Sequence, residues 1–260
     1  MLSLGRKFCI KERSVYTMNM LETLSYTVPR EDCDQYGCLR ICPMVNKAVS
    51  ASTNRNRLEG ASRENMREKL SAAWMVRRIQ LRQFLPIRAG DEVQGFGSGR
   101  TMGRRHYAQL GELYCNGRLA VSLGLIIMPV ELKTRRRLSC KDTEPLFSTP
   151  PLNEAPYFPH LPMVMGMDYS TERDFTRADC DSNASHLSFF RYPGLVWDMS
   201  SRFAPGPQLI SFMQLDYIRE CVAGSSILLG VQPQGKGYAV QARHISGKPC
   251  FNAYIEYSPM

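Results

Sequence analysis

The residues best suited to chemistry lie in one short tract, residues 177–187, which contains Asp181, Asn183 and His186. A carboxylate, an amide and an imidazole this close together can move a proton and hold a polarised carbonyl group. The tract stands where an expected strand gives way to an expected helix, and the free N–H groups at a helix start can stabilise an oxyanion. The same residue types are favoured helix caps, so these residues alone leave a catalytic site and a structural cap equally open.

A second candidate is the pair Glu220-Cys221, near the end of an expected strand over residues 208–222. A thiol is a potential nucleophile, and a carboxylate is a potential general base. Their side chains point to opposite faces of a regular strand, so a shared site requires a twist or bulge there. Taken singly, a buried core thiol and a surface carboxylate are the commoner roles of these residue types.

Other chemical signals in the sequence are weak. The remaining histidines, His106, His160 and His244, have the surroundings of ordinary surface or hydrogen-bonded residues. The glycine-rich residues 95–99 lack the Gly-Lys-Ser/Thr of a phosphate loop and indicate a sharply bent strand instead. We find no Gly-x-Ser-x-Gly elbow and no metal-ligand spacing of His, Cys and carboxylates. The sequence therefore predicts no metal and no cofactor.

The tract at 177–187 has a counterpart near the N-terminus. Arg-x-Asp-Cys-Asp occurs at 30–34 and again at 177–181, and apolar residues at helical spacing follow each copy. Where the first copy has Tyr36 and Leu39, the second has Asn183 and His186. Ala-Gly recurs at 89–90 and 223–224, after the first long strand expected in each half. These matches indicate a duplicated fold in which only the second copy carries catalytic residue types.

Strands and helices are expected twice in the same order. The first half predicts a strand at 24–28, a helix at 39–52, an exposed helix or loop at 54–67, and strands at 72–85, 92–100, 106–114 and 118–129. The second half predicts a strand at 163–176, a helix at 187–203, and strands at 208–222, 226–234, 237–245 and 250–257. Asn116-Gly117 is a strong hairpin signal. This order predicts an α+β double hot-dog fold, in which each half wraps a curved antiparallel sheet around a long helix.

The same pattern divides the chain. We expect an N-terminal extension over 1–20, a hot-dog domain over 21–141, a linker without helix or strand over 142–162, where six prolines gather, and a second hot-dog domain over 163–260. Nine cysteines is an odd number and no Cys-x-x-Cys occurs, which favours free thiols in a reducing compartment. With no signal peptide or membrane-length apolar run evident, we expect a cytoplasmic protein.

The net charge of +9 favours an acidic partner. Basic residues concentrate at 100–105 and 133–137. We recognise no nucleic-acid-binding module. The hypothesis of a nucleic-acid partner would therefore rest on charge alone, and we do not expect such a partner. On sequence grounds a solvated charged rim and a docking surface remain equally open.

Four segments together resemble the acyl-ACP thioesterases, the double hot-dog enzymes of plant plastids and bacteria. The resemblance runs from about Leu24 to the C-terminus. It rests on Trp-Met-Val-Arg-Arg-Ile-Gln-Leu at 74–81, Thr-Arg-Arg-Arg-Leu-Ser at 134–139, Asp-Cys-Asp-Ser-Asn-Ala-Ser-His at 179–186, and Leu-Asp-Tyr-Ile-Arg-Glu-Cys at 215–221. The last segment is the most specific, and all four occur in the family's order.

The resemblance implies a catalytic site made of Asp181, Asn183, His186, Glu220 and Cys221. In one mechanism Cys221 is the nucleophile, His186 activates it and Asn183 orients the imidazole. In the other, a carboxylate and His186 activate water, while Asn183 and helix N–H groups position the carbonyl. We favour water attack because a cysteine at a strand end has no evident cause of a lowered pKa.

One departure from the family concerns the spacing before His186. The family has a single residue between its Asn and His, whereas Ala184 and Ser185 both lie between Asn183 and His186 here. Either the loop bulges and preserves the site, or the site is altered and the protein binds acyl-ACP without hydrolysing it. The lack of a convincing plastid transit segment favours a bacterial protein.

The resemblance also implies the substrate and its carrier. The acyl chain would enter the N-terminal half, where Trp74 and Met75 are candidate lining residues. The carrier would be acyl carrier protein, whose acidic surface suits a basic partner. Candidate docking residues are Arg104, Arg105, Arg135, Arg136 and Arg137. An acyl-CoA thioesterase on the same fold is the alternative, and a homodimer is possible because hot-dog folds often pair.

Overall fold

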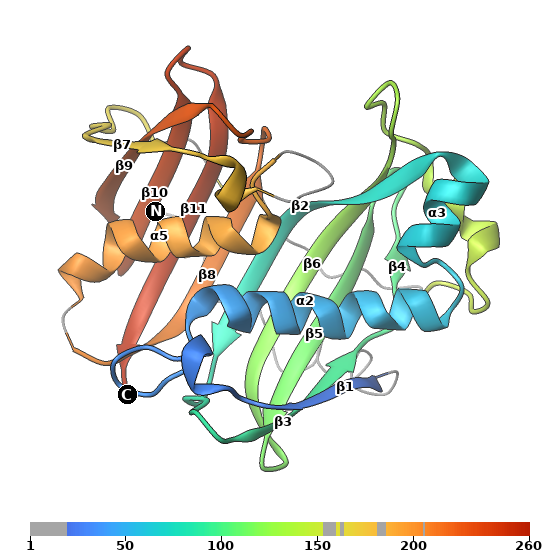
Figure 1. Ribbon diagram of the computed structural model, residues 1–260, viewed down its shortest axis with the longest axis horizontal. Helices are drawn as coiled ribbons and strands as arrows, with labels where there is room; N and C mark the ends of the chain where they lie inside the picture. The colour runs from blue at the N-terminus through green and yellow to red at the C-terminus, as the bar shows by residue number, and fades with distance from the viewer. Residues whose placement is uncertain (1–19, 153–159, 162–163, 181–185, 205) are drawn as a thin grey trace.

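Two helices lie across one face of a large curved antiparallel sheet (Figure 1). The computed structural model describes residues 20–152, 160–161, 164–180, 186–204 and 206–260. Its strands form one eleven-stranded sheet in the order β1-β3-β5-β6-β2-β8-β11-β10-β9-β7, with β4 paired to β5. This arrangement confirms the predicted α+β double hot-dog fold.

The first half of the chain supplies one end of this sheet. Its strands are β1 (Leu21–Thr27), β2 (Ala72–Gln83), β3 (Glu92–Gly97), β4 (Thr101–Met102), β5 (Tyr107–Cys115) and β6 (Arg118–Glu131). Its helices are α2 (Ile41–Leu58), α3 (Arg63–Leu70) and the single turn α4 (Cys140–Thr143). Helix α2 packs against β1, β3, β5 and β6 and buries Met44, Val45, Ala48 and Val49.

The second half supplies the other end of the sheet. Its strands are β7 (Thr171–Asp174), β8 (Gln208–Tyr217), β9 (Ser226–Gln234), β10 (Gly237–His244) and β11 (Pro249–Pro259). Its helix α5 (Tyr192–Ser200) packs against β9, β10 and β11 and also contacts α2. No helix in the described parts of the chain is long and apolar enough to span a membrane.

The halves join where β2 pairs antiparallel with β8. Arg78 lies opposite Asp216 there, and Gln80 lies opposite Gln214. The buried Arg78 guanidinium donates from Nε to Asp216 Oδ1 at 2.5 Å, and Gln80 Nε2 donates to Gln214 Oε1 at 2.6 Å. Because buried polar groups must be paired, these contacts specify the register of the junction as well as stabilising it.

The glycines of β3 and β5 let helix α2 lie directly on the sheet. A Cβ atom on Gly111 would stand 1.9 Å from the carbonyl oxygen of Ala48, and one on Gly97 would stand 2.4 Å from that of Ala51. The glycine-rich tract thus begins in strand β3, which ends at Gly97, and its glycines allow a close helix–sheet contact.

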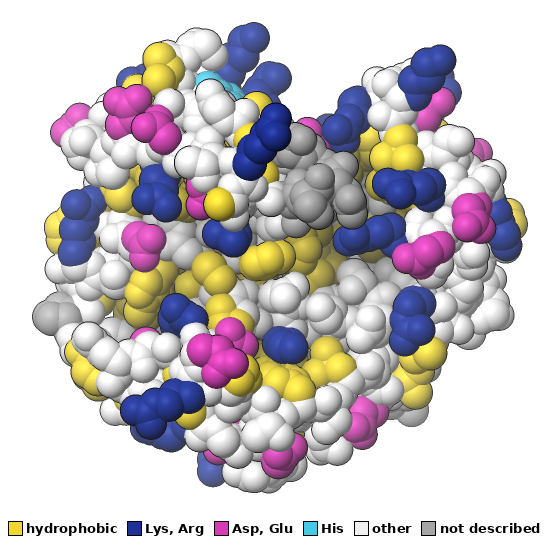
Figure 2. Space-filling model, in the orientation of Figure 1, with side chains coloured by type: hydrophobic (Ala, Val, Ile, Leu, Met, Phe, Trp, Pro, Cys, Tyr) yellow, Lys and Arg dark blue, Asp and Glu magenta, His cyan; other side chains and the backbone are white. Residues whose placement is uncertain are grey.

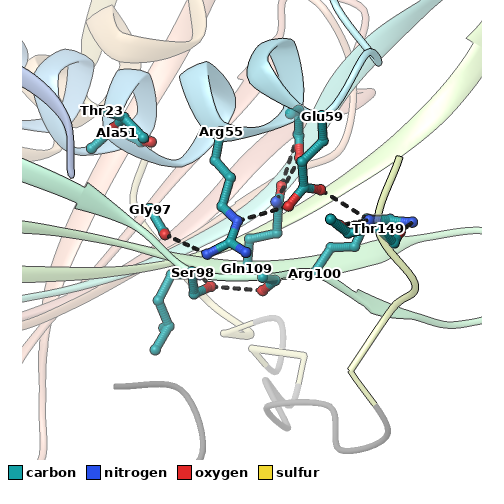
Figure 3. A network of polar contacts seen from close by, with 12 residues as sticks. Thr23, Ala51, Arg55, Glu59, Gly97, Ser98, Arg100, Gln109 and Thr149 are labelled. Carbon is teal, nitrogen blue, oxygen red and sulfur yellow. Dashed lines mark hydrogen bonds and ion pairs between the residues drawn. The ribbon is translucent and has the colours of Figure 1, made fainter. Parts of the chain in front are cut away.

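A buried polar network lies beneath the C-terminal end of α2 (Figure 3). The Arg100 side chain is 1% exposed, and its Nη1 lies 3.0 Å from Glu59 Oε2. Its Nη2 lies 2.6 Å from Glu144 Oε1 and donates to the Thr149 carbonyl at 2.7 Å. Arg55 contacts the other oxygen of Glu59 at 2.8 Å. This network ties α2 to the segment that follows α4.

Several expected boundaries differ from the structure. Helix α2 continues past residue 52 to Leu58, because its polar end residues are buried in that network and in a pair between Asn56 and Gln109. The first strand of the second half is only Thr171–Asp174. The segment expected to lack helix contains the end of α4, which a capping box at Ser139 starts, and also a 3-10 turn at Glu144–Leu146.

Candidate functional site

The backbone around the two similar tracts confirms the duplication. In the first copy, the N–H of Leu39 donates to the carbonyl of Ile87 at 2.8 Å. In the second copy, the N–H of Leu187 donates to the carbonyl of Cys221 at 2.7 Å. The tract that carries the catalytic residue types therefore crosses the Glu220-Cys221 segment, which follows β8, in the same way as its counterpart crosses the segment that follows β2.

The pairing corrects the alignment of the two tracts. His186 pairs with Val222, as Cys38 pairs with Arg88, so the counterpart of His186 is Cys38 and not Leu39. Aligning the two tracts without a gap, which set His186 against Leu39, was wrong because the two loops differ in length. In the first copy, Cys33 forms an antiparallel bridge with Leu39, six positions further along the chain. In the second copy, Cys180 forms the same kind of bridge with Leu187, seven positions further along. The second loop therefore has one extra residue before its histidine, at the place where the sequence departs from the thioesterase pattern.

The structure brings three of the five predicted catalytic residues into one region. The backbone of His186 lies beside Val222, and the backbone of its neighbour Leu187 bonds to Cys221. Glu220 and Cys221 follow β8, whose last residue is Tyr217, so they lie beyond the strand in which they were expected. The other two predicted residues, Asp181 and Asn183, lie outside the described residues.

Cys221 is fully buried at the edge of the hydrophobic core, where it also has polar partners. Its backbone N–H donates to the hydroxyl oxygen of Tyr192 at 3.0 Å. A hydrogen bond from the Cys250 thiol lowers the pKa of Cys221, with help from the Tyr192 hydroxyl and against the effect of burial. The same interaction raises the pKa of Cys250. The expectation that Cys221 has no cause for a lowered pKa is therefore wrong, because that cause comes from another strand.

Glu220 lies between the two halves of the protein. Its side chain is 32% exposed, and its Oε1 lies 3.4 Å from Nη1 of Arg135, in the loop that follows β6. Its backbone carbonyl lies 3.3 Å from Nε2 of His244. An ion pair this exposed contributes little stability, but it places a cation of the first half beside a candidate carboxylate of the second.

Four of the five predicted docking arginines line one pocket. The pocket has a volume of about 460 Å³, and its lining residues are Arg104, Arg105, Arg136, Arg137, Leu138, Ser139 and Asp142. The Cys140 N–H donates to the Arg104 carbonyl at 3.1 Å, which connects the tract of Arg104 to the segment that follows Arg137. The loop after β6 rises at the top of Figure 1, and Figure 2 shows Lys and Arg side chains on both sides of the notch there. The arrangement suits an anionic ligand.

Trp74 and Met75 lie on β2, in the first half. The indole N–H of Trp74 donates to the Ala61 carbonyl at 3.1 Å, and its ring packs edge-on against Tyr107 with centroids 5.5 Å apart. Met75 pairs with Met128 of β6. These contacts assign Trp74 a packing role, and the predicted contact of both residues with an acyl chain stays a prediction.

Sequence reasoning missed three residues of this region: Tyr192, His244 and Cys250. Tyr192 follows the segment 179–186 that resembles the thioesterase pattern, but nothing in the sequence places its hydroxyl against the backbone of Cys221. His244 ends β10 and Cys250 is the second residue of β11, on either side of a short turn. Their proximity to Cys221 depends on the sheet, so no linear spacing could reveal it.

The fold and this region define the chain as a double hot-dog protein. Among solved structures it is similar to an acyl-ACP thioesterase from Bacteroides thetaiotaomicron, with 12% identity, a TM-score of 0.78, and coverage of 94% of this chain and 99% of that one. It is also similar to the 12:0-ACP thioesterase from Umbellularia californica, with 16% identity, a TM-score of 0.73, and coverage of 93% and 98%. No model of a known protein family matches the sequence, and no curated protein matches it.

Proposed function

We propose that this protein hydrolyses the thioester of a fatty acyl group carried on acyl carrier protein, releasing the free fatty acid. The observation that carries the proposal is the backbone pairing of the His186 tract with the Glu220-Cys221 segment, within a fold shared with acyl-ACP thioesterases. The four sequence segments that resemble that family support it independently.

In the proposed mechanism, Glu220 and His186 activate a water molecule. The water gives up a proton to this pair of side chains as its oxygen attacks the thioester carbonyl, and the tetrahedral oxyanion then collapses with cleavage of the C–S bond, the pair returning the proton to the leaving sulfur. The departing thiolate takes up a proton to become the free thiol of the phosphopantetheine arm. Asn183 and backbone N–H groups at the start of the following helix would hold the carbonyl oxygen. Cys221 is the weaker nucleophile candidate because it is fully buried, whereas Glu220 is partly exposed.

Thiol release from medium- and long-chain acyl-ACP tests this proposal. Replacing His186 by Ala, or Glu220 by Gln, should lower kcat by about 100-fold or more, since a positioned general acid or base contributes about that much. His106→Ala is the matched control and should keep parental kcat. Intact-mass measurement after rapid quenching should find no acyl group on Cys221.

Two outcomes would contradict parts of this reading. An acyl–Cys221 adduct that forms and decays at the turnover rate would replace water attack by covalent catalysis. If the folded parent protein binds acyl-ACP but releases no thiol with any chain length, the hydrolysis proposal is wrong. The alternative that then remains is a protein that binds acyl-ACP without hydrolysing it.

The arginine pocket supports acyl carrier protein as the bearer of the substrate. Four guanidinium groups around one opening favour an acidic partner and speed its encounter at low salt. Charge reversal at Arg104 and Arg136 should lower kcat/KM for acyl-ACP by about tenfold or more at low salt, with kcat unchanged and the effect fading as salt screens it. Arg118→Glu, on an exposed position of β6, is the matched control.

The same pocket makes acyl-CoA a second candidate substrate, because coenzyme A carries three phosphate groups that guanidinium groups bind well. Relative kcat/KM on acyl-CoA and acyl-ACP of equal chain length separates the two. If charge reversal weakens acyl-CoA hydrolysis and leaves acyl-ACP hydrolysis intact, the pocket serves coenzyme A.

The remaining expectations follow from the same proposal. Residues 21–141 would bind the acyl chain and residues 163–260 would hold the catalytic groups, with 142–162 as the linker. The reaction would end chain elongation in bacterial fatty acid synthesis in the cytoplasm. A homodimer would show as twice the chain mass in light scattering.

A further inference from the structure

Three potential metal ligands meet at one end of the C-terminal half. The ligand atoms of Cys221, His244 and Cys250 all lie within 4.8 Å of one another. Cys221 follows β8, His244 ends β10 and Cys250 is the second residue of β11. Both thiols are fully buried, and the imidazole is partly buried.

Two thiolates and one imidazole form a ligand set that zinc takes in proteins, with a fourth position left open. Zinc bonds of about 2.0–2.3 Å in a tetrahedron hold the ligand atoms roughly 3.5–4 Å apart, so distances of up to 4.8 Å need to shorten by about 1.3 Å at most. Hard cations are disfavoured because they prefer carboxylate and carbonyl oxygens to sulfur.

The surrounding hydrogen bonds hold the three residues in place. The Cys250 carbonyl accepts from the N–H groups of Ile218 at 2.8 Å and Arg219 at 2.9 Å, which ties the segment after β8 to β11. The Glu220 carbonyl lies 3.3 Å from Nε2 of His244. Carbonyl partners of this kind orient the imidazole in many zinc sites.

We propose that Cys221, His244 and Cys250 bind one Zn²⁺ ion. Each thiol that binds as a thiolate loses its proton to solvent, so zinc replaces two protons and no redox step occurs. The ion would fix the Glu220-Cys221 segment to the turn between β10 and β11, next to the tract of His186. Cys221 then acts as a ligand and not as a nucleophile. The inference stands apart from the proposed hydrolysis, because zinc binding is measured without substrate.

Zinc binding by the full-length protein tests the site directly. The reduced, metal-free protein is titrated with Zn²⁺ against a chromophoric chelator, and then with Co²⁺ as a spectroscopic probe. We expect one ion per chain and a thiolate-to-cobalt charge-transfer band. Cys250→Ser and His244→Gln should each weaken binding by about 100-fold or more, because loss of even an outer partner of a zinc ligand costs about 10- to 100-fold. Cys115→Ser and His106→Gln are the matched controls and should bind as the parent does.

A measurement on the unmutated protein guards against variants that fail to fold. Both thiols are buried, so their alkylation follows transient opening of the fold. Zinc should slow the alkylation of Cys221 and Cys250 over time in reduced protein, as mapped by mass spectrometry, and leave the rate at Cys33 unchanged. Equal alkylation of the two cysteines with and without zinc, or zinc affinity that Cys250→Ser and His244→Gln leave intact, would overturn the proposal. A reduced protein that binds no zinc and forms a Cys221–Cys250 disulfide on mild oxidation would overturn it too, and would assign the pair to redox chemistry.

Discussion

The buried network under helix α2 makes the sharpest prediction about stability. The carboxylate of Glu59 lies 3.0 Å from Arg100 on one side and 2.8 Å from Arg55 on the other, and its side chain is 7% exposed. Glu59→Gln keeps the size of the side chain but leaves both guanidinium groups without their shared anion. Removing one partner of a buried ion pair costs about 3–5 kcal/mol, so we expect a loss of that size.

Arg100→Met perturbs the same contact from the other side. It removes the contacts with Glu59 and Glu144 and the bond to the Thr149 carbonyl, while Arg55 still pairs with Glu59. Glu144 is 27% exposed and regains water, so we expect a smaller loss of about 2–3 kcal/mol. The double variant should cost less than the sum of the single variants by about 1–3 kcal/mol, since the two residues touch.

Equilibrium unfolding in urea, followed by far-ultraviolet circular dichroism, measures these free energies. Arg118→Met, which removes an exposed arginine of β6, is the matched control and should stay within about 0.5 kcal/mol of the parent. A loss below about 1 kcal/mol for Glu59→Gln, or strictly additive effects in the double variant, would refute the reasoning that this network is a coupled buried unit.

Three further predictions concern other parts of the fold. Gly111→Ala would set a Cβ 1.9 Å from the Ala48 carbonyl oxygen and should cost about 3 kcal/mol or more in urea unfolding, because α2 must shift. Tyr192→Phe removes the acceptor of the buried Cys221 N–H and should cost about 1–3 kcal/mol in the same assay. Burial lowers the pKa of His106, so the unfolded chain binds its proton more readily. Stability should therefore fall as pH drops below about 6.5, and His106→Gln should flatten that slope in urea unfolding between pH 7 and 5.

Features set by neighbouring residues could be predicted from the sequence. Asn116 and Gly117 both have positive φ, 51° and 73°, as a tight hairpin requires, and Asn-Gly tolerates that conformation better than other pairs. The strand at Ser226–Gln234 has the predicted bounds because turn residues mark both of its ends. The repeated order of elements was visible for the same reason.

The pairing of the two tracts could be predicted only in part. The sequence showed that the second loop departs from the family spacing by one residue, but a gap-free comparison still aligned His186 with Leu39. The backbone hydrogen bonds align it with Cys38, because they are set by the sheet edge that each tract crosses.

The sequence by itself therefore determined the class of fold, the order of its elements and which residue types are available for chemistry, because these depend on local propensity and periodicity. Only the tertiary structure decided which of those residues meet. Cys250 lies 29 positions from Cys221 in the chain, yet its thiol lowers the pKa of Cys221. His244 lies 23 positions from Cys221, yet its imidazole is within 4.8 Å of both thiols. The physical reason is that strand pairing sets such distances, and the hydrogen bonds of a sheet connect residues far apart in the chain.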